Sequence, residues 1–206
     1  MTASDLPLKS DAFMCQTMAM KRAAIGLAII VVALGFWLMA SKFDEAPAIE
    51  ADGDPKRGDY VLRMAGCVGC HTDSKNQGEF LAGGRALKTD FGTFYTSNIT
   101  PDTETGIGGW TTGEFVRALK EGLSPDGDHY YPAFPYPSYA NMTDQDLIDL
   151  KAYLDTVEAV NKAVPDHDLG LIFSFRPVLT GWKFLFFEGD EYQADPDQSD
   201  QWNRGA

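Results

Sequence analysis

The residues of this sequence best suited to chemistry are Cys67, Cys70 and His71, which lie in the stretch "AGCVGCHTD". In a helix these positions fall at i, i+3 and i+4, so the three side chains project from one face. The spacing C-x-x-C-H is the attachment signature of c-type haem. The thiols add to the porphyrin vinyl groups as thioethers, and the histidine coordinates the iron from the proximal side. We therefore predict one covalent haem c on this chain.

Three other kinds of site use similar residues. A thioredoxin-like redox pair belongs in a βαβ context, and the flanking sequence shows none. A zinc site needs a fourth ligand, but the only further cysteine, Cys15, lies far upstream. A structural disulfide between Cys67 and Cys70 leaves His71 without a role. Haem attachment is the interpretation that uses all three side chains.

A second axial ligand, typically Met or His, is expected on the distal side of an electron-carrying haem. Five of the seven methionines lie in the N-terminal segment that ends at Ala40. Met64 stands one turn before the haem motif on the proximal helix, so it cannot reach the distal face. Elimination leaves Met142, for which ordinary core filling is the alternative. His129 is the competing ligand, and His167 is a weaker one.

The haem propionates are carboxylates that need hydrogen-bond donors when they are buried. We predict Asn98, Trp110 and Arg176 as candidates. Tryptophan donates through its indole N–H, and arginine presents a planar fork of donors. The alternative is that Trp110 is a core residue and Arg176 a surface charge.

The charge balance bounds the partners of this protein. Its 206 residues hold 17 Lys and Arg against 30 Asp and Glu, a formal net charge of −13. This balance argues against a nucleic-acid partner and for an acidic, solvated surface that also steers a basic protein partner. The length leaves room for one domain with a small core and some extra segments.

An apolar run, "AAIGLAIIVVALGFWLMA" from Ala23 to Ala40, follows Lys21 and Arg22. Its 18 residues are enough to cross a bilayer core. Basic residues before the run and acidic residues after it place the N-terminus in the cytoplasm. We therefore predict a cytoplasmic segment over 1–22 and a single transmembrane anchor or signal helix over 23–40 in the bacterial inner membrane.

A cleaved signal peptide beginning at Met20 is the alternative for this run. A retained anchor is favoured because the run is longer than a usual signal sequence. In addition, Leu38 stands where a cleavage site needs a small residue. Both interpretations export the body of the protein, which places the haem domain in the periplasm.

The exported body is predicted to hold a linker over 41–53, a haem domain over 54–165 and an aromatic-rich connector over 166–206. Three helices are expected in the haem domain, and their starts are marked by Asp54 before Pro55, by a Thr111/Glu114 capping box and by Thr143 with Asp146. The Gly- and Thr-rich stretch between the first two helices has no sustained period and is predicted to be an ordered loop. Helices joined by long loops around a flat cofactor indicate an all-α haem domain.

The connector carries too much aromatic surface to stay in water, since burying one such side chain stabilises by about 1.5 to 3 kcal/mol. Its rings belong to Phe173, Phe175, Trp182, Phe184, Phe186 and Phe187. We predict a short helix near "VLTGWKFLFF" that folds back on the haem domain, with the remainder forming a partner interface. The alternative is an interfacial helix on the membrane, since Lys183 interrupts the apolar run.

Three longer strings resemble a known group of proteins. "NITPDTETGIGGWTTGEFVRALKEG", "HYYPAFPYPSYANMTDQDLIDLKAYL" and "RPVLTGWKFLFF" are similar to the cytochrome c subunits of membrane-bound bacterial dehydrogenases for alcohol, gluconate, fructose or aldehyde. The resemblance runs from Asp54 to the C-terminus. It implies a class I cytochrome c fold, with Cys67, Cys70 and His71 as the attachment motif and Met142 where a distal methionine stands.

The resemblance also implies a role in electron transfer in a respiratory chain, without catalysis by this chain itself. Electrons are expected from a separate dehydrogenase catalytic subunit and pass to quinone, or to a downstream cytochrome or oxidase. Those subunits carry two or three haem motifs, whereas this chain has one. Because "SDQWNRGA" echoes "GDPKRGDY", we expect the chain to stop near the start of a second haem unit. The alternative function is a haem peroxidase or ligand sensor with an open distal site.

Overall fold

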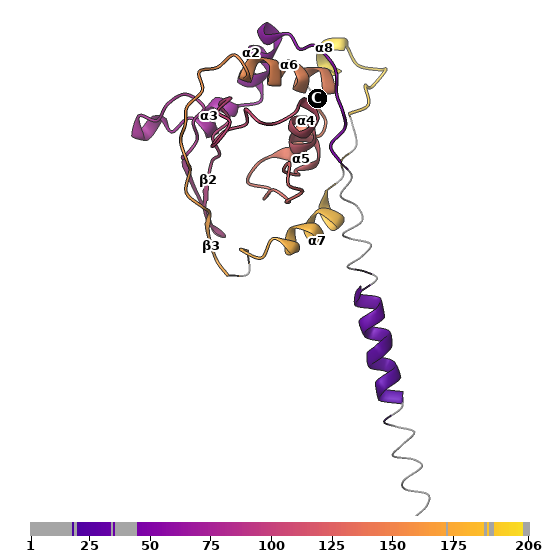
Figure 1. Ribbon diagram of the computed structural model, residues 1–206. Helices are drawn as coiled ribbons and strands as arrows, with labels where there is room; N and C mark the ends of the chain where they lie inside the picture. Colours follow the sequence, from indigo (N-terminus) through magenta and orange to yellow (C-terminus); the bar gives the residue numbers. More distant parts are fainter. Residues whose placement is uncertain are drawn as a thin grey trace, which may run out of the picture. The chain divides into compact units, whose positions relative to one another are not determined.

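The computed structural model describes residues 18, 20–33, 35, 45–171, 173–187, 189 and 192–203. The chain divides into two compact units, Met1–Glu45 and Ala46–Ala206. In the first unit residues 20–33 are helical (Figure 1). Within the described part of the chain, no helix is both long and apolar enough to cross a membrane. Residues 34 and 36–40 of the predicted span lie outside the described residues, so the anchor stays a prediction.

The second unit is built on the three predicted helices, which are α2 (Pro55–Met64), α4 (Thr112–Glu121) and α6 (Asp144–Leu154). α6 packs against both α2 and α4 (Figure 1). Further helices complete the unit: α3 (Cys67–His71), the 3-10 helix Ser74–Asn76, α5 (Tyr136–Tyr139), α7 (Pro177–Phe186) and α8 (Asp200–Asn203). The predicted helical framework of the domain is therefore confirmed.

Side-chain caps begin α2, α4 and α6 where the sequence predicts them. The Asp54 side chain accepts from the backbone N–H of Lys56 at the start of α2. Thr111 and Glu114 form both bonds of a capping box on α4. Thr143 accepts from the Asp146 N–H at the start of α6. These bonds satisfy amides that the first helical turn leaves without a partner.

A small antiparallel sheet corrects the all-α prediction. Its strands β1 (Ala86–Thr89), β2 (Gly92–Tyr95) and β3 (Asp168–Leu169) lie in the order β1-β2-β3. Two strands fall in the stretch predicted to be a loop, and they are too short to show an alternating pattern. Gly92 has a φ of 129°, and a Cβ atom there would lie 2.3 Å from the Asp168 backbone oxygen. The glycine therefore permits the close approach of β3 to β2.

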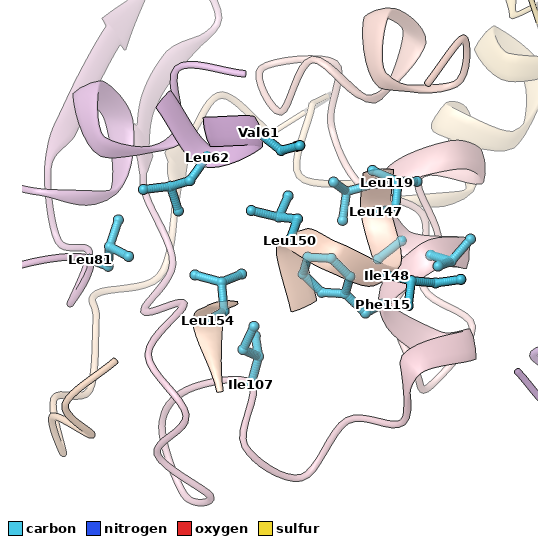
Figure 2. Close-up of a cluster of buried hydrophobic side chains, with 12 residues drawn as sticks. Val61, Leu62, Leu81, Ile107, Phe115, Leu119, Leu147, Ile148, Leu150 and Leu154 are labelled. Atoms are coloured by element: carbon cyan, nitrogen blue, oxygen red, sulfur yellow. The ribbon is translucent and has the colours of Figure 1, made fainter. Parts of the chain in front are cut away.

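The hydrophobic core lies between the long helices (Figure 2). α2, α4 and α6 all supply apolar side chains to it, and two loops add one each. Its members include Val61, Leu62, Leu81, Ile107, Phe115, Leu119, Leu147, Ile148, Leu150 and Leu154. The core therefore joins segments that are far apart in the sequence around α6.

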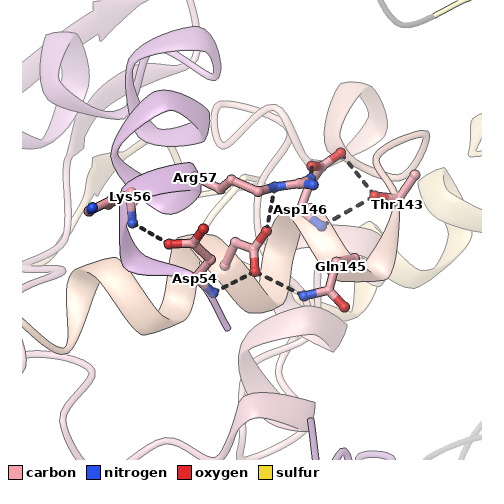
Figure 3. A network of polar contacts seen from close by, with 7 residues as sticks. Asp54, Lys56, Arg57, Thr143, Gln145 and Asp146 are labelled. Carbon is pink, nitrogen blue, oxygen red and sulfur yellow. Dashed lines mark hydrogen bonds and ion pairs between the residues drawn. The ribbon is translucent and has the colours of Figure 1, made fainter. Parts of the chain in front are cut away.

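A buried carboxylate, Asp149, ties the start of α2 to α6 (Figure 3). Its side chain is 1% exposed and lies with Oδ2 2.8 Å from Arg57 Nε in an ion pair. Oδ1 accepts from the Asp54 backbone N–H at 2.8 Å and from Gln145 Nε2 at 2.9 Å. Burying a carboxylate charge is unfavourable, and the fold tolerates it here because the charge is both paired and hydrogen-bonded.

The connector folds back on the haem domain through α7, as the sequence predicts. Leu179 is buried, and the Phe187 ring lies 5.1 Å from the Tyr136 ring. Lys183 Nζ also donates to the backbone oxygen of Glu121. On the other side of α7, Phe184 is 82% exposed. The partner interface predicted for this exposed part stays a prediction.

Gly58 of α2 provides a test of the helix crossing. A Cβ atom there would lie 2.0 Å from the backbone oxygen of Asp149. We expect Gly58→Ala to lower the free energy of unfolding by about 1 to 3 kcal/mol, because the helices must separate to admit a methyl group. Denaturant unfolding followed by circular dichroism measures the change. Gly109→Ala, where no heavy atom lies within 4 Å of the added Cβ, is the matched control and should change stability by less than about 0.5 kcal/mol. Equal stability of the two variants would contradict the role given to Gly58.

Candidate functional site

The helix α3 presents the three predicted haem-binding side chains. Gly66, at its N-cap, has a φ of 73°, a left-handed conformation that lets the chain turn directly from α2 into α3. Cys67 is half-buried, Cys70 is exposed, and both are free thiols. Together with His71 they occupy one short helix at the predicted spacing. The disulfide alternative is not what the structure contains.

His71 is held in the form that binds a metal. Its Nδ1 lies 2.7 Å from the backbone oxygen of Ser97. A carbonyl oxygen only accepts, so Nδ1 carries the proton and Nε2 keeps its lone pair. Burial lowers the pKa of His71, and the hydrogen bond to Ser97 partly opposes that shift. The neutral imidazole is therefore oriented as a ligand, with Nε2 available to an iron.

All three side chains line one cavity of about 330 Å³. This volume lies within the range of ligand pockets, which are mostly apolar. Many of the remaining lining side chains are rings: Phe94, Trp110, Phe115, Tyr130, Tyr131, Phe134 and Tyr139. A flat apolar macrocycle with two vinyl groups and an iron centre matches these walls and donors. The residues present thus fit a covalent haem c.

Asn98 lines the cavity, but its amide is used inside the protein. Its Nδ2 donates to Thr105 Oγ1 at 3.1 Å and to the Val160 backbone oxygen at 2.7 Å. Its Oδ1 accepts from the backbone N–H of Thr100 at 3.0 Å. Both amide hydrogens are therefore engaged, and this geometry does not support the propionate-donor role predicted for Asn98.

Trp110 and Arg176 differ in their relation to the cavity. Trp110 lines it and packs against the core, and its indole N–H makes no hydrogen bond within the described residues. Arg176 is not part of the lining. It donates through a guanidinium nitrogen to the His129 backbone oxygen at 3.2 Å and lies 5.6 Å from the centre of the Tyr131 ring. Trp110 therefore stays a candidate donor to a propionate, whereas the contacts of Arg176 with His129 and Tyr131 do not bring it into the cavity lining.

Met142 does not join the haem motif in this structure. It is half-buried, packs against the hydrophobic core and is absent from the cavity lining. The competing ligand His129 is absent from the lining as well. The distal ligation assigned to Met142 by elimination stays a prediction that this placement does not support. The assignment of Met142 assumed that a protein side chain is the distal ligand. The direction in which the Met142 side chain points is what tests this assumption.

The sequence did not predict the aromatic part of the cavity wall, which comes from residues 129–139. The segment "HYYPAFPYPSY" lies between two predicted helices, and four of its rings line the cavity. Its aromatic content was the available signal, because such rings seldom remain in water. Tyr139 also donates to the Ala65 backbone oxygen at 2.9 Å, which ties this wall to the end of α2. His167, considered above only as a weaker axial ligand, lines the cavity from just before β3.

This combination of helices, cavity and attachment motif defines a c-type haem protein. A family model described as cytochrome c matches residues 55–158, about half of the chain. The chain belongs to the cytochrome c family, and haem c is its cofactor. Its helices and loops agree with the predicted class I fold, to which the small sheet is an addition.

Known proteins resemble most of the chain. It is 48% identical over 151 residues to a subunit of nicotinate dehydrogenase from Pseudomonas putida, covering 73% of this chain and 13% of that protein. It is 44% identical over 167 residues to a diheme cytochrome c-type protein of Cereibacter sphaeroides, covering 79% and 56%. It is 37% identical over 184 residues to the fructose dehydrogenase cytochrome subunit of Gluconobacter japonicus, covering 88% and 38%. The predicted resemblance to dehydrogenase cytochrome subunits is confirmed, and the chain spans only part of each of these relatives.

Two tyrosines of the segment 129–139 make a matched test of the aromatic wall. We expect Tyr139→Phe to lower the free energy of unfolding by about 1 kcal/mol, because it removes the hydrogen bond to Ala65. Tyr136 is fully buried, and its hydroxyl has no hydrogen-bond partner among the described residues. Tyr136→Phe should therefore leave stability unchanged or raise it slightly. Thermal unfolding measures both variants, and a larger loss for Tyr136→Phe would contradict this assignment of the two hydroxyls.

Proposed function

We propose that this chain transfers electrons in the periplasm as the cytochrome c subunit of a dehydrogenase complex. The observation that carries the proposal is the placement of Cys67, Cys70 and His71 on one helix at the wall of an aromatic cavity, with Nε2 of His71 left for iron. Bound haem c supplies one-electron redox chemistry. The printed names of the relatives, which include cytochrome subunits of fructose, gluconate and alcohol dehydrogenases, support the same role.

The residues of the chain set the conditions for that chemistry. The aromatic walls keep water from the cavity, and burial together with hydrogen bonding to the axial histidine tunes a haem potential. Ser97 fixes the orientation of the His71 ring. Cys70 is exposed and Cys67 is half-buried. The edge of the cavity that carries the two cysteines therefore reaches the protein surface. A partner redox centre approaches most closely at that edge.

Donor, acceptor and location follow from the same proposal. The donor is a dehydrogenase catalytic subunit, and the acceptor is quinone or a downstream cytochrome or oxidase. The net charge of −13 favours a partner with a basic docking surface. Residues 23–40 serve as the inner-membrane anchor or export signal, with the haem domain over 54–165 in the periplasm. The connector over 166–206 offers the exposed side of α7 to another subunit.

A second candidate function, binding of a small ligand at an open distal face, is favoured by one observation. Among the described residues that line the cavity there is no methionine, and Met142 packs against the core instead. If His71 were the only protein ligand, a bound haem iron would be able to take carbon monoxide or cyanide. Electron transfer remains the first proposal, because the relatives are cytochrome subunits.

Covalent attachment is the direct test of the haem proposal. The full chain, expressed in a host with cytochrome c maturation, should give a band that stains for haem on a denaturing gel. Cys67→Ala combined with Cys70→Ala should abolish that band, because no thioether can form. Cys15→Ala is the matched control, since it removes a thiol outside the motif, and should keep the stain. An unstained wild-type band would falsify the proposed function.

The distal face is tested by Met142→Leu, a substitution that conserves volume in the core. We expect the oxidised wild type to show a near-infrared sulfur-to-iron band that the variant loses, because Met142 is the predicted distal ligand. Only the reduced variant should then bind carbon monoxide at neutral pH. An unchanged spectrum, with carbon monoxide binding to both proteins, would contradict ligation by Met142 and favour the second candidate function.

A further inference from the structure

A second histidine, His167, lines the same cavity as His71. It comes from another part of the chain, directly before β3. The pairing of Thr93 with Asp168 brings His167 opposite Phe94 of β2. Its ring centre lies 5.3 Å from that of Phe94 and 5.6 Å from that of Tyr131, and both of these rings also line the cavity. The sheet therefore delivers a polar side chain to an otherwise aromatic part of the wall.

The backbone determines which nitrogen of His167 carries the proton. The N–H of Tyr95 donates to Nδ1 of His167 at 3.2 Å. A backbone amide only donates, so Nδ1 holds a lone pair, and the proton of the neutral ring is on Nε2. Partial burial, and then the charge of Arg176, lower the pKa of His167, while Asp166 opposes them, so the ring favours its neutral form. This tautomer is the reverse of the one in His71.

The two histidines are consequently suited to different partners. His71 offers a lone pair at Nε2, which binds a metal, whereas His167 offers an N–H at the same ring position, which binds an acceptor. Haem c is apolar apart from its iron and two propionate carboxylates, which lie across the macrocycle from the thioether-forming vinyl groups. His167 is also solvent-exposed, so it lines the cavity where the cavity meets the surface. Carboxylates are least costly to place at such an edge, provided that a donor meets them.

We propose that Nε2–H of His167 donates a hydrogen bond to a haem propionate, and that the β2–β3 pairing positions it for this contact. The inference rests on the proposed haem function and adds a residue to it. Asn98 has no amide hydrogen left for this purpose, and Arg176 lies outside the lining. His167 acts on the iron only through the propionate, so it is a positioning residue that also tunes the potential.

Two substitutions in the full-length haem-loaded chain separate the roles of the two ring nitrogens of His167. In His167→Asn the side-chain oxygen takes the place of Nδ1 and keeps the bond from Tyr95, but nothing replaces Nε2–H. In His167→Gln the amide nitrogen reaches the position of Nε2 and restores a donor. Spectroelectrochemical titration measures the midpoint potential, and resonance Raman spectroscopy measures the propionate bending band. Thr93→Ser, in the same β2–β3 pairing but outside the cavity lining, is the control.

We expect His167→Asn to lower the ratio of reduced to oxidised haem about threefold at a fixed potential, which is about 28 mV for a one-electron couple. The physical reason is that a propionate without its donor keeps its full negative charge and favours the oxidised iron. The Raman band should shift in His167→Asn, while His167→Gln and the control stay close to the wild type. Haem staining of the same samples shows whether haem is attached. It therefore separates a failure of this inference from a failure of the proposed function.

Three outcomes overturn the inference. If haem-loaded His167→Asn matches the wild type in both potential and Raman band, no bond to a propionate exists. Equal shifts in the Asn and Gln variants, or an equal shift in the control, would show a structural effect without a role for the Nε2–H donor. Protein that takes up no haem at all removes the proposed function and the inference together.

Discussion

The close crossing of α2 and α6 is the contact on which the rest of this structure depends. It exists because Gly58 has no side chain where α2 meets the backbone of Asp149. The Asp149 carboxylate also accepts a hydrogen bond from the backbone N–H of Asp54 and forms an ion pair with Arg57. Because α2 leads through Gly66 directly into α3, the position of the haem motif is set by how α2 lies on α6. A small displacement at this crossing is therefore passed on to the cavity wall.

A haem that fills the cavity would help a small domain with long loops to remain folded. Many of its lining side chains are aromatic rings, and such rings gain dispersion energy from apolar contacts. A covalently attached haem supplies those contacts, and a group that binds only the folded form stabilises that form. Tyr139 donates to the backbone oxygen of Ala65, so a direct hydrogen bond links the aromatic segment 129–139 to the end of α2.

The two histidines of the cavity show how the backbone assigns chemical roles to identical side chains. His71 donates to a carbonyl and is left with a lone pair, whereas His167 accepts from an amide and is left with an N–H. One ring is thereby suited to iron and the other to a carboxylate. The family relationship is consistent with the first role, and the small sheet, an addition to the helical framework, provides the second.

The sequence alone was sufficient for the features that depend on neighbours along the chain. The spacing of Cys67, Cys70 and His71 indicated the cofactor, and the caps at Asp54, Thr111 and Thr143 marked the three long helices, because both kinds of signal lie within one helical turn. Other features needed the tertiary structure. β3 pairs with a strand far earlier in the chain, no local pattern states which way the Met142 side chain points, and the proton of His167 is placed by an amide 72 residues away. Contacts between residues so far apart in the sequence form only when the whole domain packs. The haem-attachment motif could therefore be recognised from the sequence, whereas the cavity around it is determined by the tertiary structure.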